Sequence, residues 1–562
     1  MTSSVAVSEQ GSWAASISIE AGLYAALSLF CLGVRLILAA QAPFQPQEAV
    51  QALSAHALAT GADPLHMPQA PSPGLLALQA LLFSLFGSSE AFARLPVILL
   101  SGLSPLAFFA LRHVMGRKEA LIAAAILSLS PTWAVLGAQG VGAAFGATLL
   151  LFALVGWVRA MVGGKARWAG LSGLAMGLAL AAGAEPWLAL LFAFGVAAWW
   201  GGRGLLMRLQ LRPFLVCLAA SFALASTACG LNPRGLQAAL DLSWGWAVPL
   251  LRREPLAFVH QLLLYPVVEP LALALAALGL AERVAWVRPL GVWAVACSVY
   301  LLLSGQPLAG ALLCLPALAA LGALGARRLW RSAAALRREQ RWESLAGGLA
   351  LSTFLYIVVS GLSLRWELAL VVLLLAGVGI GGTLLGLAWA REGAQAARAT
   401  LAIPAAALLL LWAVAGLGRF GVASGRSAAT LLRPEVALPG VQDLAADLQR
   451  LSWSRTADPC ELPIVAEEGL SPLVKWQLRR MSVVEWVAVQ PWQLQGQVVL
   501  TALPQLRAQQ GSYVGQAYAV SARWQPRFAG LQSYLRWLLF REGQSAELTY
   551  AYLWVPLEGN AR

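Results

Sequence analysis

The segment "FQPQEAV", residues 44–50, holds the residues near the start of the chain that are best suited to chemistry. Glu48 is a carboxylate just past the first long apolar run, and the neutral amide Gln47 precedes it. A carboxylate within reach of an acceptor hydroxyl can take its proton during nucleophilic attack. Glu48 is equally well explained as an acid at a helix N-terminus, where the helix dipole favours it. Gln47 could bind a sugar or a phosphate, or cap the same helix.

Further candidates lie in other polar segments. Asp63 and His66 could form an acid–base pair, although a turn acid before proline and a surface histidine are the commoner roles. Arg94 could contact a phosphate, or pair with Glu90 one helical turn earlier. Segment 231–258 could bind a lipid-linked phosphate, but contact with ordinary lipid headgroups carries somewhat more weight. Its cations include Arg234, Arg252 and Arg253.

The composition places these residues in a membrane protein. Of the 562 residues, 59% are hydrophobic and only 12% are charged, and the mean hydropathy is +0.70. A soluble protein of this length needs more charge on its surface. The formal charge of +13 does not indicate nucleic-acid binding, because the basic residues lie in short loops between apolar runs. The six cysteines form no pattern typical of a disulfide framework or a metal site, and we expect no cofactor.

Apolar runs long enough to cross a bilayer recur along the first three quarters of the chain. We predict thirteen transmembrane helices, at residues 21–40, 91–111, 119–136, 142–158, 168–183, 187–201, 212–230, 259–281, 287–304, 308–325, 345–363, 368–390 and 400–418.

Charge in the loops predicts the orientation. Loops on one side of these spans carry nineteen Lys and Arg, and loops on the other side carry four. Because basic loops stay in the cytoplasm, we expect a cytoplasmic N-terminal segment (1–20), a transmembrane domain (21–425) and an extracytoplasmic domain (430–562). The first outer loop, 41–90, should hold two interfacial helices, at 47–60 and 72–87, because the apolar stretch 72–87 is short for a span.

The tail predicts a small α/β domain, because polar residues return and strand-like and helix-like runs alternate. We expect helices at "VQDLAADLQRLS", "SPLVKWQLRRM" and "LQSYLRWLLFRE", and strands at "LPIVAEE", "VVEWVAV", "GQVVLTAL", "YVGQAYAVSARW" and "ELTYAYLWVP". The tryptophans of the tail could stack on sugar rings, although packing and seating on the outer loop is the commoner role for any one of them.

Several segments together carry a family resemblance: "GVRLILAA", "PFQPQEAVQALSAHALATG", "SPGLLALQALLFSLFGSSEAFARLPVIL" and "GRKEALIAAAILSLSPTW". Their order resembles the GT-C membrane glycosyltransferases, among them the protein O-mannosyltransferases and the transferase that adds aminoarabinose to lipid A. With "SPLVKWQLRRM" and "LRWLLFREGQSAELTYAYLWVP" in the tail, the chain looks most like the flippase-activity-associated family of GT-C-like proteins. The likeness is best over residues 21–160 and 430–562.

The resemblance implies a polyprenyl-phosphate sugar as donor, a glycan, lipid or protein as acceptor, and transfer at the outer face of the plasma membrane. It also implies an Asp-Glu pair in the first outer loop, and Gln47 occupies the Asp position while Glu48 occupies the Glu position. Relatives often carry an acid in the next outer loop, which here reads "GAQGVGAAFG" (137–146). Two hypotheses follow: an active glycosyltransferase, or a GT-C-like protein without catalysis that serves as a binding or assembly partner.

Overall fold

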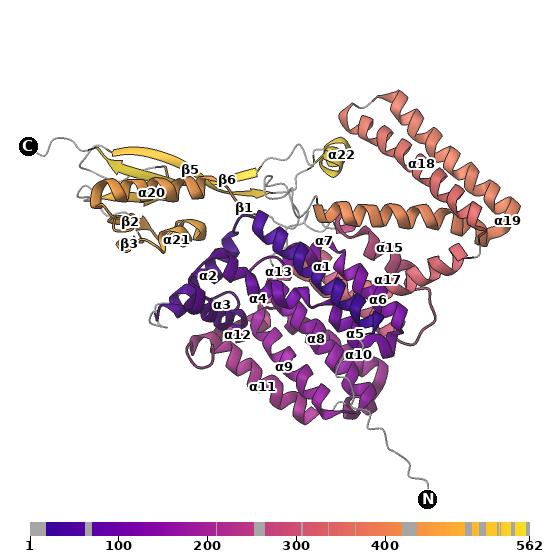
Figure 1. The fold of residues 1–562 in the computed structure, drawn as a ribbon, viewed down its shortest axis with the longest axis horizontal. Helices are drawn as coiled ribbons and strands as arrows, with labels where there is room; N and C mark the ends of the chain where they lie inside the picture. Colours follow the sequence, from indigo (N-terminus) through magenta and orange to yellow (C-terminus); the bar gives the residue numbers. More distant parts are fainter. Residues whose placement is uncertain are drawn as a thin grey trace, which may run out of the picture.

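The computed structural model describes residues 18–61, 70–208, 211–251, 265–304, 307–334, 336–365, 367–418, 435–488, 497–504, 513–524, 528, 530–540 and 546–557. It is a helical bundle joined to a C-terminal sheet domain (Figure 1). The helices before the sheet domain are α1 (Ile19–Gln41), α2 (Pro46–Ala59), α3 (Pro73–Phe86), α4 (Glu90–Gly102), α5 (Pro105–Met115), α6 (Arg117–Ser128), α7 (Pro131–Leu136), α8 (Gly142–Gly163), α9 (Ala166–Ala182), α10 (Glu185–Arg208), α11 (Leu211–Ser226), α12 (Arg234–Gly245), α13 (Val248–Leu251), α15 (Pro270–Gly279), α16 (Val287–Ser304), α17 (Pro307–Ala334), α18 (Arg338–Leu364) and α19 (Leu368–Gly416).

The helices agree with the predicted spans. Within the described residues, seven are long and apolar enough to cross a membrane by length and composition. Shorter apolar helices lie at five of the other predicted spans. The predicted span 119–136 forms two helices, α6 and α7, so thirteen as a number stays a prediction. Two predicted spans fall inside α19, which loses helical geometry at Gly393 (φ 83°) between them. The chain is therefore a polytopic α-helical membrane protein.

Glycines let several helices pack closely. A Cβ on Gly173 would collide with the backbone of Phe214, which brings α9 against α11. Gly279 and Gly325 make the same close approach possible between α15 and α17. Small residues at such crossings are typical of membrane helix bundles, where packing rather than hydrophobic burial holds the helices together.

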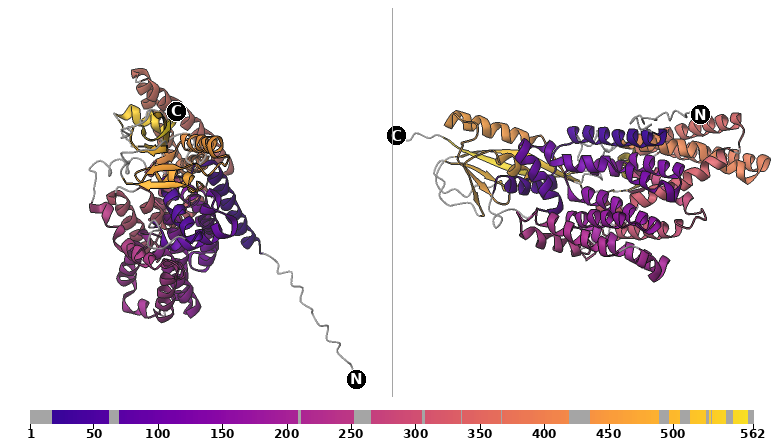
Figure 2. Two further views of the ribbon diagram at one scale, coloured as in Figure 1. Left: turned by 90° about the vertical axis from the view of Figure 1, so that its left-hand side faces the viewer. Right: turned by 60° about the horizontal axis from the view of Figure 1, so that its bottom comes forward.

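The two ends of the bundle differ in chemistry. At one end, ion pairs link loops that the charge count predicts to be cytoplasmic. Glu20 lies 3.8 Å from both Arg112 and Arg117, and Glu119 lies 2.7 Å from Arg327. The other end carries α2, α3, α12 and the sheet domain (Figures 1 and 2). The predicted loop sets therefore gather at opposite ends of the molecule.

The C-terminal domain contains a mixed six-stranded sheet of order β1-β5-β6-β4-β2-β3. Strands β2, β3 and β4 are parallel, whereas β1, β5 and β6 pair antiparallel. The eight predicted helices and strands of the tail are present, and the short strand β1 was not predicted. The elements are β1 (Glu435–Ala437), α20 (Gly440–Thr456), β2 (Ile464–Glu467), α21 (Pro472–Leu478), β3 (Val484–Val487), β4 (Val498–Thr501), β5 (Tyr513–Trp524), α22 (Leu531–Phe540) and β6 (Ala546–Pro556).

Helix α21 seats the sheet domain on the segment that contains α2 and α3. Trp476 is 1% exposed, and its ring centroid lies 5.4 Å from that of Phe44 and 6.0 Å from that of Phe83. The guanidinium of Arg479 stacks on the same indole at 3.4 Å and its Nη2 donates to the carbonyl of Ser88 at 3.0 Å. This tryptophan thus serves packing and seating rather than sugar stacking.

Candidate functional site

Helices α2 and α3 form where the sequence predicts interfacial helices. Pro46 starts α2, Glu48 accepts the backbone N–H of Gln45 at 2.9 Å, and Gly61 (φ 73°) follows the helix end. A carboxylate in the first turn satisfies one of the free N–H groups of a helix start. Pro73 starts α3 in the same way, and Gly87 (φ 84°) ends it.

Glu48 lies in a closed ionic centre. Its side chain is fully buried. Arg94 holds both of its oxygens, Nε to Oε1 and Nη2 to Oε2, each at 2.8 Å. The backbone N–H of Gly140 donates to Oε1 at 2.6 Å. Arg94 also donates to the carbonyls of Ala39, Ala42 and Pro43.

This environment keeps Glu48 ionised. Burial alone would raise the pKa of the carboxyl, but the charge and hydrogen bonds of Arg94, with the N–H groups of Gly140 and Gln45, hold it below its ordinary value. A carboxylate with four donors and no exposed surface has no lone pair directed at an acceptor hydroxyl. The geometry favours the second interpretation of Glu48, an acid that holds the helix start in place.

The other predicted site residues are dispersed. Gln47 is exposed on α2, whereas the next residue, Glu48, is fully buried. Arg234 is exposed at the start of α12. Of the other five predicted residues, Arg94 pairs with Glu48, and the rest lie outside the described residues: Asp63, His66, Arg252 and Arg253.

A buried amide network extends from the ionic centre. Gln79 donates to the carbonyls of Ala93 (2.6 Å) and Gly140 (3.4 Å), and its Oε1 accepts from Gln51 at 3.1 Å. Gln51 exchanges two hydrogen bonds with the backbone of Ser72, at 2.9 and 3.0 Å. Sequence reasoning missed these two glutamines because they are spaced like ordinary polar helix residues.

A second carboxylate, Glu185, follows the end of this network in the chain. Ser72 Oγ donates to the carbonyl of Ala182 at 2.8 Å, in the turn between α9 and α10. Oε2 of Glu185 lies 2.8 Å from the point where a Cβ on Gly183 would stand, and that point is 4.0 Å from Cα of Ala143. Glu185 therefore lies beside the start of α8, where the resemblance implies an acid that segment 137–146 does not contain.

Glu185 differs from Glu48 in its surroundings. It is partly exposed, and within the described part of the chain no cation pairs with it. Glu185 interacts electrostatically with the phenol of Tyr300. The hydroxyl of Tyr300 donates a hydrogen bond to the carbonyl of Trp246 at 3.2 Å. The sequence holds one indication of this residue. The acid in "GAEPW" (183–187) lies between two apolar runs, in a loop that the charge count assigns to the set with few basic residues.

Two more amides at this end have unused donors. Nε2 of Gln45 and Nε2 of Gln139 are buried, and neither has a hydrogen-bond partner among the described residues. Gln45 and Gln139 lie next to the two backbone donors of Glu48, because the Gln45 N–H itself is one and Gly140 follows Gln139. Buried donors of this kind are normally satisfied by water or by a ligand.

No cluster of three or more His, Cys, Asp or Glu residues suited to a metal occurs among the described residues. The sheet domain has a cavity of about 540 Å³ between α20 and β5. Asp447 lies in its wall and accepts from Tyr518 at 2.6 Å and from Arg450 at 3.0 Å. This polar cavity is separate from the network around Glu48.

Comparison with known proteins supports the fold. A profile of the family described as dolichyl-phosphate-mannose-protein mannosyltransferase matches residues 69–229. The crystal structure of ArnT from Cupriavidus metallidurans bound to undecaprenyl phosphate is 19% identical, covers 85% of this chain and 92% of that chain, and superposes with a TM-score of 0.50. AglB from Archaeoglobus fulgidus, in complex with an inhibitory peptide and a dolichol-phosphate, is 12% identical over 83% of this chain and 64% of that chain, with a TM-score of 0.48.

A comparison with curated protein sequences finds no match. The profile match lies in the part of the chain that contains α3 to α11, and the likeness to ArnT extends over most of both chains. The chain therefore shares the fold of ArnT, and its residues 69–229 match the profile of the dolichyl-phosphate-mannose-protein mannosyltransferase family.

Proposed function

We propose that this protein transfers a sugar from a polyprenyl-phosphate-linked donor to an acceptor hydroxyl at the outer face of the plasma membrane. The observation that carries the proposal is Glu185, a carboxylate without a cationic partner in the described chain, at the end of a GT-C fold that holds the outer-loop helices. The lipid phosphate in the ArnT structure supports the choice of donor. The N-terminus is then cytoplasmic and the sheet domain extracytoplasmic, as the loop charges predict.

In this proposal Glu185 is the general base. The acceptor oxygen attacks the anomeric carbon and forms the new glycosidic bond, while its proton passes to the carboxylate. The bond from the anomeric carbon to the phosphate oxygen breaks, and polyprenyl phosphate leaves with the electron pair. Glu48 does not take part directly but fixes the start of α2 and the loop at Gly140 around the reacting groups.

The leaving phosphate needs hydrogen-bond donors or cations. Gln45 and Gln139 supply amide donors without partners in the described chain, and Gln47 and Arg234 supply exposed polar groups at the same end. Arg252 and Arg253 remain candidates for the same role on the strength of the sequence. The acceptor is a glycan, a lipid or a protein.

The second candidate function is binding or assembly without catalysis. It is favoured by Gln47, which is neutral at the position where the resemblance implies an Asp, and by the complete pairing of Glu48. A protein of this kind would keep the fold and the donor-binding surface but would not release polyprenyl phosphate.

The test is turnover by the purified full chain in detergent or lipid nanodiscs. Polyprenyl-phosphate sugars carrying different labelled hexoses and pentoses are supplied with membrane extracts as acceptors, and release of polyprenyl phosphate is measured. The same sugar phosphates without the lipid serve as controls. Turnover of a lipid-linked donor alone supports the enzyme, whereas binding of these donors without turnover favours the second function.

A further inference from the structure

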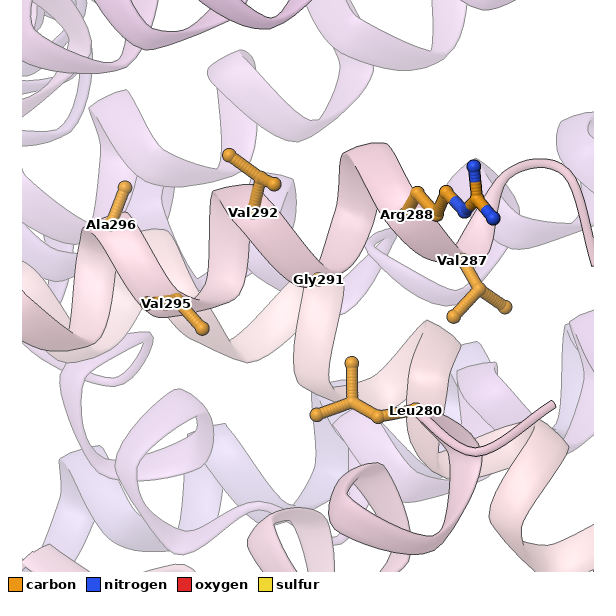
Figure 3. A pocket seen from close by; sticks show the side chains of 7 residues that line it. All are labelled: Leu280, Val287, Arg288, Gly291, Val292, Val295 and Ala296. Carbon is orange, nitrogen blue, oxygen red and sulfur yellow. The ribbon is translucent and has the colours of Figure 1, made fainter. Parts of the chain in front are cut away.

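A groove lies on the outside of the bundle along α16. It has a volume of about 510 Å³ and is lined by Leu280, Val287, Arg288, Gly291, Val292, Val295 and Ala296. The lining is aliphatic except for one cation, and Figure 3 shows Arg288 at one end of the row and Ala296 at the other. Along the helix these residues span about 12 Å at the rise of an α-helix, which suits one extended hydrocarbon chain.

The cation lies at the end of the bundle away from the candidate site. Tyr300, which contacts Trp246, is twelve residues further along α16, or about 18 Å at 1.5 Å per residue. Glu282, just before the groove, lies 3.8 Å from Arg331, which belongs to the loops that the charge count predicts to be cytoplasmic. Arg288 is exposed, and no ion pair to it occurs among the described residues.

We propose that this groove binds one anionic phospholipid of the leaflet at this end, with an acyl chain along α16 and its phosphate at Arg288. A guanidinium pairs well with a phosphate, and basic pockets between helices on the cytoplasmic side suit anionic headgroups. The groove does not serve the polyprenyl donor, because the phosphate of that donor belongs at the opposite end of the bundle. The groove and its cation do not depend on the proposed function, whereas the exclusion of the donor lipid rests on it.

Gly291 keeps the groove open. A Cβ at this position would lie 2.9 Å from Cδ2 of Leu280, so any larger side chain must enter the space between the two. Figure 3 shows Leu280 directly facing the helix at Gly291. Val295 is 57% exposed on the same wall, and a larger residue there fills the groove from the side without displacing Leu280.

The experiment is native mass spectrometry of the purified full chain, titrated with phosphatidylglycerol or phosphatidylcholine. We expect the wild-type protein to retain one phosphatidylglycerol with at least tenfold preference over phosphatidylcholine. Arg288→Gln should lose this preference, and Gly291→Leu and Val295→Trp should lose the retained lipid. Matched controls outside the groove are Arg212→Gln and Gly195→Leu, whose positions are exposed and which should behave as wild type.

Three results would overturn the inference. The first is equal retention of both phospholipids by the wild-type protein. The second is retention of phosphatidylglycerol by both Gly291→Leu and Val295→Trp at the wild-type level. The third is that Arg288→Gln abolishes retention of undecaprenyl phosphate while phosphatidylglycerol is unaffected, which would assign the groove to the donor lipid. The unfolding temperature of each variant should equal that of the wild type, so that lipid retention is compared between folded proteins.

Discussion

Arg94 donates hydrogen bonds to both carboxylate oxygens of Glu48 at 2.8 Å, which joins the start of α2 to the first turns of α4. The remaining guanidinium N–H groups bind the carbonyls at the end of α1, and Gly140 binds the carboxylate from the loop before α8. One ion pair thus fixes four segments of the chain at the end that carries the sheet domain. The pair is a structural centre around which the candidate site is arranged.

The first prediction concerns the stability that this pair supplies. Glu48→Gln leaves the buried guanidinium without its counter-charge, and breaking a buried pair in this way costs about 3–5 kcal/mol. We expect a clearly lower unfolding temperature in detergent than for the wild-type protein. Glu461→Gln, at an exposed acid of the sheet domain, is the matched control and should change little. Equal unfolding temperatures for Glu48→Gln and the wild type would refute the structural role.

The second prediction concerns acid. Because the folded state holds the pKa of Glu48 below its ordinary value of 4.5, the unfolded state binds the proton first as the pH falls. The stabilisation is fully present above pH 4.5 and is lost below it, as the pH approaches the folded-state pKa. Unfolding temperatures of the wild type should decrease over that range. Glu48→Gln should show a shallower decrease, and parallel curves would contradict the prediction.

The predictions from sequence succeeded where local patterning decides the structure. The short helices at 46–59 and 73–86 and the alternation in the tail follow from periodicity, proline starts and glycine ends. Arg94 was expected either to bind phosphate or to pair with Glu90, the acid one turn away. The structure instead pairs it with Glu48, 46 residues earlier, because burial at the junction of α1, α2 and α4 requires a counter-charge.

The role of Glu185, by contrast, could not be predicted from local patterns in the sequence. Its significance depends on the packing of the turn at Gly183 against the start of α8, and no spacing along the chain predicts that contact. The count of basic residues in the loops predicts an orientation but takes no account of acidic residues such as Glu185. The burial of Arg35 also depends on packing between helices: it is fully buried, with its Nη1 donating to the carbonyl of Cys31 at 2.9 Å.

The third prediction tests how the sheet domain is seated. Trp476→Ala removes an indole buried against Phe44 and Phe83, and deletions of this size cost about 3–5 kcal/mol. We expect thermal unfolding at a lower temperature. Trp486→Ala removes the same group from a strand where it is 39% exposed and should have a much smaller effect. If both variants unfold alike, Trp476 does not anchor the domain.

The fourth prediction tests the position of Glu185 without changing its charge. Gly183 has an extended backbone (φ −169°), so Gly183→Ala introduces no backbone strain there. The new methyl group would stand 2.8 Å from Oε2 of Glu185 and must displace the carboxylate. Turnover of the lipid-linked donor should fall by about tenfold or more, since small displacements of a catalytic group are costly. Gly195→Leu, at an exposed helix position, should retain wild-type turnover and unfolding temperature.

The most direct test of the account is the turnover of a labelled polyprenyl-phosphate sugar by wild-type protein, Glu185→Gln and Asp241→Asn. Asp241 is an exposed acid on α12 at the same end of the bundle. We predict wild-type turnover for Asp241→Asn and a loss of about 10²–10⁴-fold for Glu185→Gln, the usual contribution of a general base. Undiminished turnover by folded Glu185→Gln would contradict the central claim.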